Sequence, residues 1–179
     1  MSDTQQVKMM VYAALMAALT AAGAYIAVPI GPVPIVLQNM FVLLTGLLLG
    51  SRWGLAGVGV YLLAGAFGLP VFAGGTGGIG RFFGPTGGYL LGYLPAVYMV
   101  GIVSEKTNRN AFFEVSAMIG ATLLVYLIGV PWLKIAANLS WAKAMGLGMY
   151  PFLLGDAIKI AAAFAIIKAV RPVLGGLNS

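Results

Sequence analysis

The sequence contains no cysteine and no histidine, and it has very few charged residues. Without cysteine the chain forms no disulfide and has no thiol nucleophile. Without histidine it lacks the commonest metal ligand and the usual general base of enzymes. Only 8% of its residues are charged and 61% are hydrophobic, whereas a soluble domain carries about 25% charged residues. This composition predicts an integral membrane protein and argues against an enzyme.

The few charges that are present are mostly basic and give a formal net charge of +6. No basic cluster stands apart from the apolar segments, so the charge does not indicate nucleic-acid binding. Residues of either charge are absent over four long runs: 9–51, 53–80, 82–104 and 115–133. A membrane-spanning helix needs about 20 mainly apolar residues, and each run has or approaches that length.

The apolar runs, together with the positions of proline and glycine, predict an all-α integral membrane protein that forms a single domain over residues 1–179. Six transmembrane helices are expected over residues 8–28, 36–49, 55–66, 87–103, 111–129 and 151–170. The proline-rich segment after the first helix cannot continue it. The longer link at 130–150 has room for a short interfacial helix. Ordered loops are expected at the outer face.

The basic residues predict the orientation in the membrane, because an even number of helices places both termini on one side. That side would hold Lys8, Arg52, Lys106, Arg109, Lys168 and Arg171. The other side would hold Arg81, Lys134, Lys143 and Lys159. By the positive-inside rule, this distribution predicts cytoplasmic termini. The glycine-rich loop, the proline-rich loop and the start of the last helix would then lie at the outer face.

The segment 67–93 contains a glycine-dense loop around a lone charge, Arg81. Glycine permits tight turns and close approach of the backbone to a ligand. Irregular backbone at membrane depth is tolerated only where it is buried in protein or lines a cavity, so the loop predicts a binding site. Its GTGGIG string has the spacing of nucleotide-binding glycine motifs, but it lacks their flanking strand and the Lys-Ser/Thr pair of a P-loop.

Asp156 and Lys159 lie three residues apart near the start of the last apolar helix, so they share one helix face. Charges inside a membrane segment are costly and usually mark ligand or ion pathways. The alternative is an interfacial ion pair, with Lys159 reaching toward the outer surface. As binding groups, Asp156 accepts from N–H donors, Lys159 donates to a carbonyl, and Arg81 pairs with a carboxylate.

Further candidate ligand contacts come from the glycine-rich loop and the start of the second helix. The polar and backbone candidates are Gly75, Thr76, Gln38 and Asn39. The aromatic candidates for an apolar wall are Phe72, Phe82, Phe83, Tyr89, Tyr93, Trp132 and Trp141. Each aromatic residue alone is also compatible with packing or interfacial anchoring. We select Phe72 and Tyr89 from this group as site residues.

The first helix carries a stripe of small residues, Ala14, Ala18 and Ala22, at intervals of four. Small residues at this spacing allow two helices to approach closely in lipid. The stripe is therefore a candidate contact for a partner helix, with packing inside the protein as the alternative.

Four stretches of the sequence resemble BioY, the biotin-specific substrate-binding S component of energy-coupling factor (ECF) transporters. They are AALMAALTAAGAYI, PIGPVPIVLQN, GLPVFAGGTGGIGRFFGPTGGYLLGYLPA and GDAIK. The resemblance implies an S-component-like fold of six helices in a prokaryotic cell membrane, with biotin bound near the outer face. It also implies three partner subunits, one transmembrane coupling subunit and two ATPases. The coupling subunit would contact the first helix, at Ala14, Ala18 and Ala22.

Biotin, as the transported ligand, fits the candidate residues, and no cofactor is expected. We assign Asp156 and Lys159 to its ureido ring and Arg81 to its carboxylate, although Lys159 is an alternative partner for the carboxylate. Two other functions remain open: an S component for another small vitamin, and a solitary biotin transporter that works without ATPases. An ion-coupled transporter is disfavoured because the apolar segments contain a single buried carboxylate.

Overall fold

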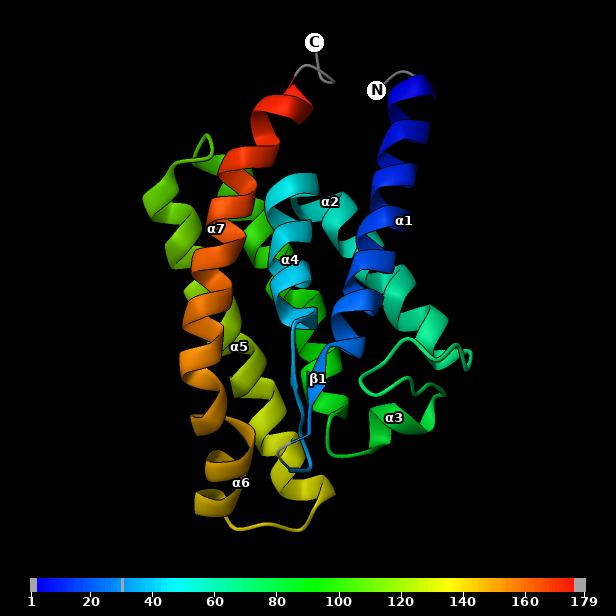
Figure 1. Ribbon diagram of the computed structural model, residues 1–179, viewed down its shortest axis with the longest axis vertical. Coiled ribbons are helices and arrows are strands. Elements are labelled where there is room, and N and C mark those ends of the chain that lie inside the picture. Colours follow the sequence, from blue (N-terminus) through cyan, green and yellow to red (C-terminus); the bar gives the residue numbers. More distant parts are fainter. Residues whose placement is uncertain (1–2, 30, 176–179) are drawn as a thin grey trace.

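The computed structural model describes residues 3–29 and 31–175, with side chains as far as residue 172. The helices are α1 (Asp3–Tyr25), α2 (Gln38–Ala66), α3 (Gly80–Phe83), α4 (Gly87–Lys106), α5 (Ala111–Ala136), α6 (Trp141–Gly148) and α7 (Leu153–Gly175). Two short strands, β1 (Ala27–Val28) and β2 (Ile35–Val36), and a 3₁₀ turn, η1 (Tyr150–Phe152), complete the elements. The long helices form an elongated bundle, and both described chain ends lie at the same end of it (Figure 1).

The helix labelled α2 is two antiparallel helices, 38–49 and 51–66, that meet at Gly50. Gly50 has φ 76° and ψ −171°, a conformation that glycine adopts without steric cost. The chain reverses there, so that Gly54 packs against the backbone of Gly46. A side chain at position 50 would lie 2.1 Å from Oε1 of Glu105. With this division, the fold is the predicted six-helix bundle.

The bundle has the length and surface of a multi-pass membrane protein. Four helices of the described chain, α1, α2, α4 and α5, are long and apolar enough to cross a membrane. α7 has similar length but carries four charged residues. Large apolar side chains on the outside, such as Leu63, Leu127 and Ile135, are more than half exposed, as expected for a surface that faces lipid.

Several element boundaries differ from the sequence-based prediction. α1 begins at Asp3 and ends at Tyr25, and the proline-rich segment after it forms an unpredicted antiparallel hairpin in which Ala27 lies opposite Val36. α5 continues beyond residue 129, through Pro131, to Ala136, because a proline interrupts the helical hydrogen bonds only locally. α7 likewise continues through Pro172 to Gly175. The predicted short helix in the link is α6.

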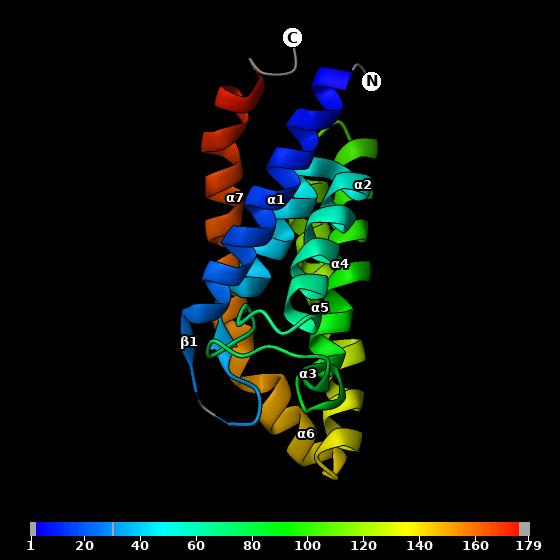
Figure 2. The ribbon, with the colours of Figure 1, turned by 90° about the vertical axis from the view of Figure 1, so that its right-hand side faces the viewer.

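The connections that form the predicted site gather at the end of the bundle opposite the termini. These are the β1–β2 hairpin, the glycine-rich loop, α3 and α6 (Figure 2). Within the loop, two backbone hydrogen bonds between Phe72 and Thr76 close a tight turn. Gly74 and Gly75 lie in this turn, and both have positive φ. α7 packs mainly on α2 and only lightly on α5. A loosely packed seam therefore runs between α5 and α7.

Candidate functional site

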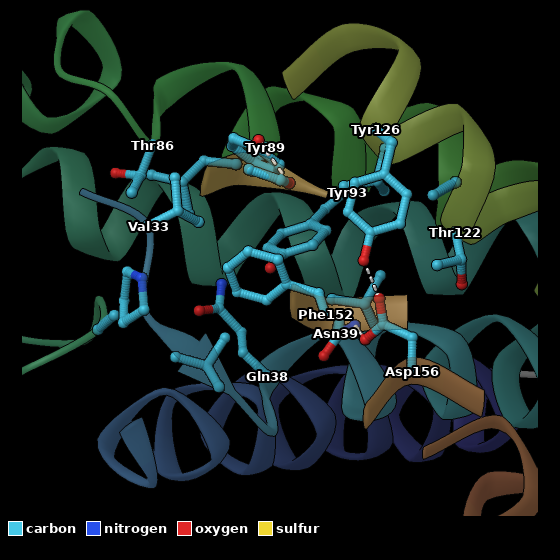
Figure 3. Close-up of a pocket in the computed structure, with 18 of the residues that line it drawn as sticks. Val33, Gln38, Asn39, Thr86, Tyr89, Tyr93, Thr122, Tyr126, Phe152 and Asp156 are labelled. Carbon is cyan, nitrogen blue, oxygen red and sulfur yellow. Dashed lines mark hydrogen bonds between the residues drawn. The ribbon is translucent and has the colours of Figure 1, made fainter. Parts of the chain in front are cut away.

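A cavity of about 140 Å³ lies at the loop end of the bundle. Its walls come from the β1–β2 hairpin, the glycine-rich loop, α2, α4, α5 and the first turns of α7 (Figure 3). Much of the lining is apolar and includes Val33, Val42, Leu43, Phe72, Leu90, Val125 and Phe152. The site is thus an apolar pocket with a few polar groups, which is the usual composition of a small-molecule site.

Asp156 is the anchor of the polar part of the cavity and is only 5% exposed. Its Oδ1 accepts hydrogen bonds from Nδ2 of Asn39 at 2.7 Å and from Nζ of Lys159 at 3.0 Å. Its Oδ2 accepts a hydrogen bond from the hydroxyl of Tyr126. Because a carboxylate offers about four lone-pair positions, Asp156 retains room to accept one more donor from a ligand.

Lys159 is buried beside Asp156, with 6% of its surface exposed. Its ammonium group has three N–H donors, and the described structure uses one of them, on Asp156. The ion pair therefore lies inside the protein and lines the cavity. The burial of Lys159 shows that its side chain does not reach the exposed surface of the described structure, and the binding role of the pair stays a prediction.

Two buried amide atoms of the cavity lining have no hydrogen-bond partner among the described residues. They are Nε2 of Gln38, a donor, and Oδ1 of Asn39, an acceptor. Both residues line the cavity, and Gln38 is only 2% exposed. Since nearly all buried polar groups in proteins are paired, these two atoms indicate a ligand that both donates and accepts hydrogen bonds.

Arg81 also lines the cavity, but it is exposed and therefore lies at the rim, on the single turn of α3. Its guanidinium forms no ion pair with a carboxylate of the described chain. Thr76 lines the wall as well, and its hydroxyl donates to the carbonyl of Ala73 at 3.1 Å. The cavity therefore has a buried polar end and a cationic rim.

All the predicted ligand contacts except Gly75 line the cavity. Gly75 occupies the turn between Phe72 and Thr76 with φ 69°, and a side chain there would come within 3.3 Å of the Tyr25 ring. The turn explains why position 75 is a glycine. Direct contact of Gly75 with a ligand stays a prediction.

Among the other aromatic candidates, Tyr93 lines the cavity and the rest do not. Phe83 is 72% exposed, and Nε1 of Trp132 donates to the carbonyl of Gly84 at 3.0 Å. Trp141 is also exposed and stacks beneath the ammonium of Lys134. Phe82 packs edge-on against Phe72 behind the cavity wall. Trp132 and Phe82 thus hold the glycine-rich loop that shapes the site.

Among the polar and aromatic residues that line the cavity, sequence reasoning missed four, namely Thr86, Thr122, Tyr126 and Phe152. Thr122 and Tyr126 are the most informative omissions, because their spacing of four residues places both on one face of α5. A polar pair at helical spacing within an otherwise apolar span was the signal that would have identified them.

Comparison with known proteins gives a consistent result. Residues 1–176 match the model of the BioY family. A probable biotin transporter BioY from Pyrococcus horikoshii is 40% identical over 158 residues, which is 88% of this chain and 93% of the relative. The biotin transporter BioY from Thermotoga maritima is 38% identical over 164 residues, 92% of this chain and 96% of the relative.

A solved structure also matches nearly the whole chain. It is the crystal structure of the S-component for biotin from an ECF-type ABC transporter, with a TM-score of 0.89 and 33% identity. The match covers 96% of this chain and 95% of the other.

Proposed function

The chain belongs to the BioY family, and from this premise we propose that it binds biotin in the cavity and imports it as the S component of an ECF-type transporter. The observation that carries the proposal is the set of open donors and acceptors at the buried end of the cavity. The open acceptors are a lone pair of Asp156 and Oδ1 of Asn39. The open donors are Nζ of Lys159 and Nε2 of Gln38.

These groups complement the ureido ring of biotin, which presents two N–H donors and one carbonyl acceptor. In the proposed pose, the N–H groups donate to Asp156 and Asn39, and the carbonyl accepts from Lys159 and Gln38. The apolar bicycle and the valerate chain then lie along the apolar wall formed by Phe72, Tyr89 and their neighbours. The ligand would pair both amide atoms of the described cavity lining that lack a partner, Nε2 of Gln38 and Oδ1 of Asn39.

The carboxylate of biotin then points toward the rim, where Arg81 is the candidate partner. Arg81 is exposed and free of ion pairs with the described carboxylates, whereas Lys159 already pairs with Asp156 at 3.0 Å. A guanidinium also binds a carboxylate in a bidentate geometry. We therefore favour Arg81 over Lys159 as the partner of the carboxylate.

The proposed orientation places the termini in the cytoplasm and the cavity at the outer face, because the basic residues near the termini exceed those at the loop end. Ala14, Ala18 and Ala22 are all exposed on α1, which supports their role as the contact for a coupling subunit. ATP hydrolysis would take place on two partner ATPases. The chain itself would form one membrane domain with no catalytic step and no cofactor.

Equilibrium binding of labelled biotin to the purified protein in detergent, without partners, tests the proposal. We expect saturable binding of one biotin per chain. Unlabelled biotin should compete, and lipoate, which keeps a carboxylate on an apolar chain but has no ureido ring, should compete far more weakly. Absence of biotin binding by folded protein would contradict the proposal. Tighter binding of a different vitamin would instead identify an S component for that vitamin.

Biotin uptake by cells that carry this chain with or without the coupling subunit and ATPases separates the S component from a solitary transporter. We expect uptake above background only when all the subunits are present. Uptake by the chain alone would favour the solitary alternative.

A further inference from the structure

Building on the proposed function, we infer that Tyr126 is a positioning residue for biotin: it holds Asp156 toward the cavity and separates the cavity from a groove that opens to lipid. Tyr126 would not have to contact the ligand to do this. Its effect on binding would pass through the carboxylate to which its hydroxyl donates a hydrogen bond (Figure 3).

The groove lies in the seam between α5 and α7, on the side of Asp156 away from Gln38 and the cavity. It has a volume of about 490 Å³, and its walls are almost entirely apolar, with Ile119, Leu123 and Ile160 among them. Ile119 and Leu123 are about half exposed on the outside of the bundle. In a multi-pass membrane protein, such a groove is open to hydrocarbon rather than to water.

Three residues, Thr122, Tyr126 and Asp156, line both the cavity and the groove. Asp156 is therefore part of a thin wall with a polar pocket on one side and an apolar groove on the other. An ionised carboxylate that turned toward hydrocarbon would lose much solvation free energy. The wall needs a group that satisfies the groove-facing side of the carboxylate.

Tyr126 is that group. The hydroxyl of Thr122 donates to the carbonyl of Met118 at 2.9 Å and is not available to Asp156. Asn39 and Lys159 both donate to Oδ1 of Asp156. Oδ2 has one partner among the described residues, the hydroxyl of Tyr126. Removal of that hydroxyl leaves Oδ2 without a donor and the carboxylate free to rotate.

A double-mutant cycle of Tyr126→Phe and Asp156→Asn tests this assignment, because the phenylalanine keeps the aromatic ring and removes only the hydroxyl. Biotin affinity and thermal unfolding without ligand are measured for all four proteins in detergent. Tyr126→Phe should weaken biotin binding about 10- to 100-fold, the usual range for a hydrogen bond to a charged group. In the Asp156→Asn background it should change affinity less than about 3-fold, since coupled residues do not act additively.

Thr122→Val is the matched control, because it removes a hydroxyl from the same two cavities without removing a bond to Asp156. The change in binding free energy caused by Thr122→Val should add to the change caused by Asp156→Asn. A second readout compares biotin with biotin methylated on a ureido nitrogen. Tyr126→Phe should reduce the preference for biotin over the methylated ligand, which a general loss of packing would not do.

The outcomes separate this inference from the proposed function. Failure of the unmodified protein to bind biotin overturns the proposed function. In that case the double-mutant cycle, measured by thermal unfolding without ligand, still tests the contact between Tyr126 and Asp156. Normal binding by the unmodified protein with additive effects of the two substitutions overturns the positioning role alone. Unchanged biotin affinity of Tyr126→Phe also overturns it.

Discussion

α7 contributes to an ion pair toward each of its ends, and the two pairs differ in how completely the surrounding groups satisfy their hydrogen bonds. Near the start of the helix, Asp156 and Lys159 line a cavity in which amide atoms of Gln38 and Asn39 have no partner among the described residues. Near its end, Arg171 pairs with Glu114 on α5. The first pair faces a cavity, and the second ties helices together.

The pair at Arg171 is embedded in a hydrogen-bond network. Nη1 of Arg171 donates to Oε2 of Glu114 at 2.8 Å, and its Nη2 donates to Oε1 of Glu114. The hydroxyl of Ser104 on α4 donates to Oε1 of Glu114 at 2.7 Å. Nη2 also donates to the carbonyl of Leu47 at 3.2 Å. The network thus joins four helical segments and leaves only Nε of Arg171 unpaired among its described atoms.

The carbonyl of Leu47 is free to join this network because of the chain reversal at Gly50. In an uninterrupted helix it would accept from the amide of Ser51. That amide donates instead to Oε1 of Glu105 at 2.8 Å, and the hydroxyl of Ser51 donates to Oε2 at 2.9 Å. The glycine turn therefore creates both an acceptor for Arg171 and a donor pair for Glu105.

The comparison shows that burial of a charge in this membrane protein does not by itself indicate a ligand site. Glu114 is 1% exposed, which is less than Asp156 at 5%. What distinguishes Asp156 is the unused hydrogen-bonding capacity around it. An unpaired buried polar group costs about 1–3 kcal/mol, and this cost applies to Nε2 of Gln38 and Oδ1 of Asn39 in the described structure.

The strongest test of a structural role for the pair of Glu114 and Arg171 is Glu114→Gln. We expect the free energy of unfolding in detergent to fall by about 3–5 kcal/mol, because Arg171 loses its counter-charge inside the bundle. Biotin affinity of the folded protein should stay within about 2-fold, which is a free-energy change below about 0.5 kcal/mol. Chemical unfolding and equilibrium binding on the same sample measure both quantities.

Glu105→Gln is the matched control for this substitution. Glu105 is an exposed acceptor for Ser51, so its loss should cost only about 1 kcal/mol of stability. A loss of biotin affinity in Glu114→Gln as large as that in an Asp156 variant would remove the distinction between the two pairs.

The reciprocal test, at the pair of Asp156 and Lys159, is Asp156→Asn. Biotin affinity should fall by about 2–5 kcal/mol, because the ligand and Lys159 both lose a negatively charged partner in a desolvated site. Isothermal titration measures the change, and Asp3→Asn, an exposed carboxylate at the start of α1, is the control with unchanged affinity. An unchanged biotin affinity of Asp156→Asn would mean that Asp156 does not bind the ureido ring.

The sequence predicted the pair of Asp156 and Lys159 and missed the pair of Glu114 and Arg171 for a simple physical reason. Asp156 and Lys159 are three residues apart in an apolar helix, so their proximity follows from helix geometry. Glu114 and Arg171 are separated by 57 residues and lie near helix ends, where charges ordinarily face water or lipid headgroups. Only the packing of α5 against α7 brings them together.

The same limit explains the elements that the sequence did not reveal. The six helices followed from apolar runs and turn residues, whereas the β1–β2 hairpin involves only two residues in each strand. Its pairing depends on the tertiary position of α2. The spacing of Thr122 and Tyr126 marks a polar face of α5, but the contact of Tyr126 with Asp156 is evident only once α7 is placed beside α5. Local patterns thus identified the helices and the charges, and packing identified the partners.

A smaller effect is expected from Gln38→Leu, which keeps the approximate size of the side chain and removes its unpaired amide. Biotin affinity should fall about 10-fold through the loss of one hydrogen bond. The stability of the empty protein should stay equal or rise by up to about 1 kcal/mol, because a buried donor without a partner is removed. Gln6→Leu on the exposed start of α1 is the control. A loss of stability together with unchanged affinity would show that Gln38 has a structural role instead.

The smallest effect is expected at Arg81, because its exposed guanidinium is solvated before the ligand arrives. Arg81→Gln should weaken biotin binding by about 0.5–1 kcal/mol, the range of solvent-exposed ion pairs, and the loss should shrink as salt concentration rises.

Biotinamide, which has no carboxylate, should bind the unmodified protein and Arg81→Gln with equal affinity. As a control, Arg52→Gln should not change the affinity for either ligand. An equal loss for biotin and biotinamide would show that Arg81 does not pair with the carboxylate. Lys159 would then become its partner, and the buried end of the cavity would receive the carboxylate in place of the ureido ring.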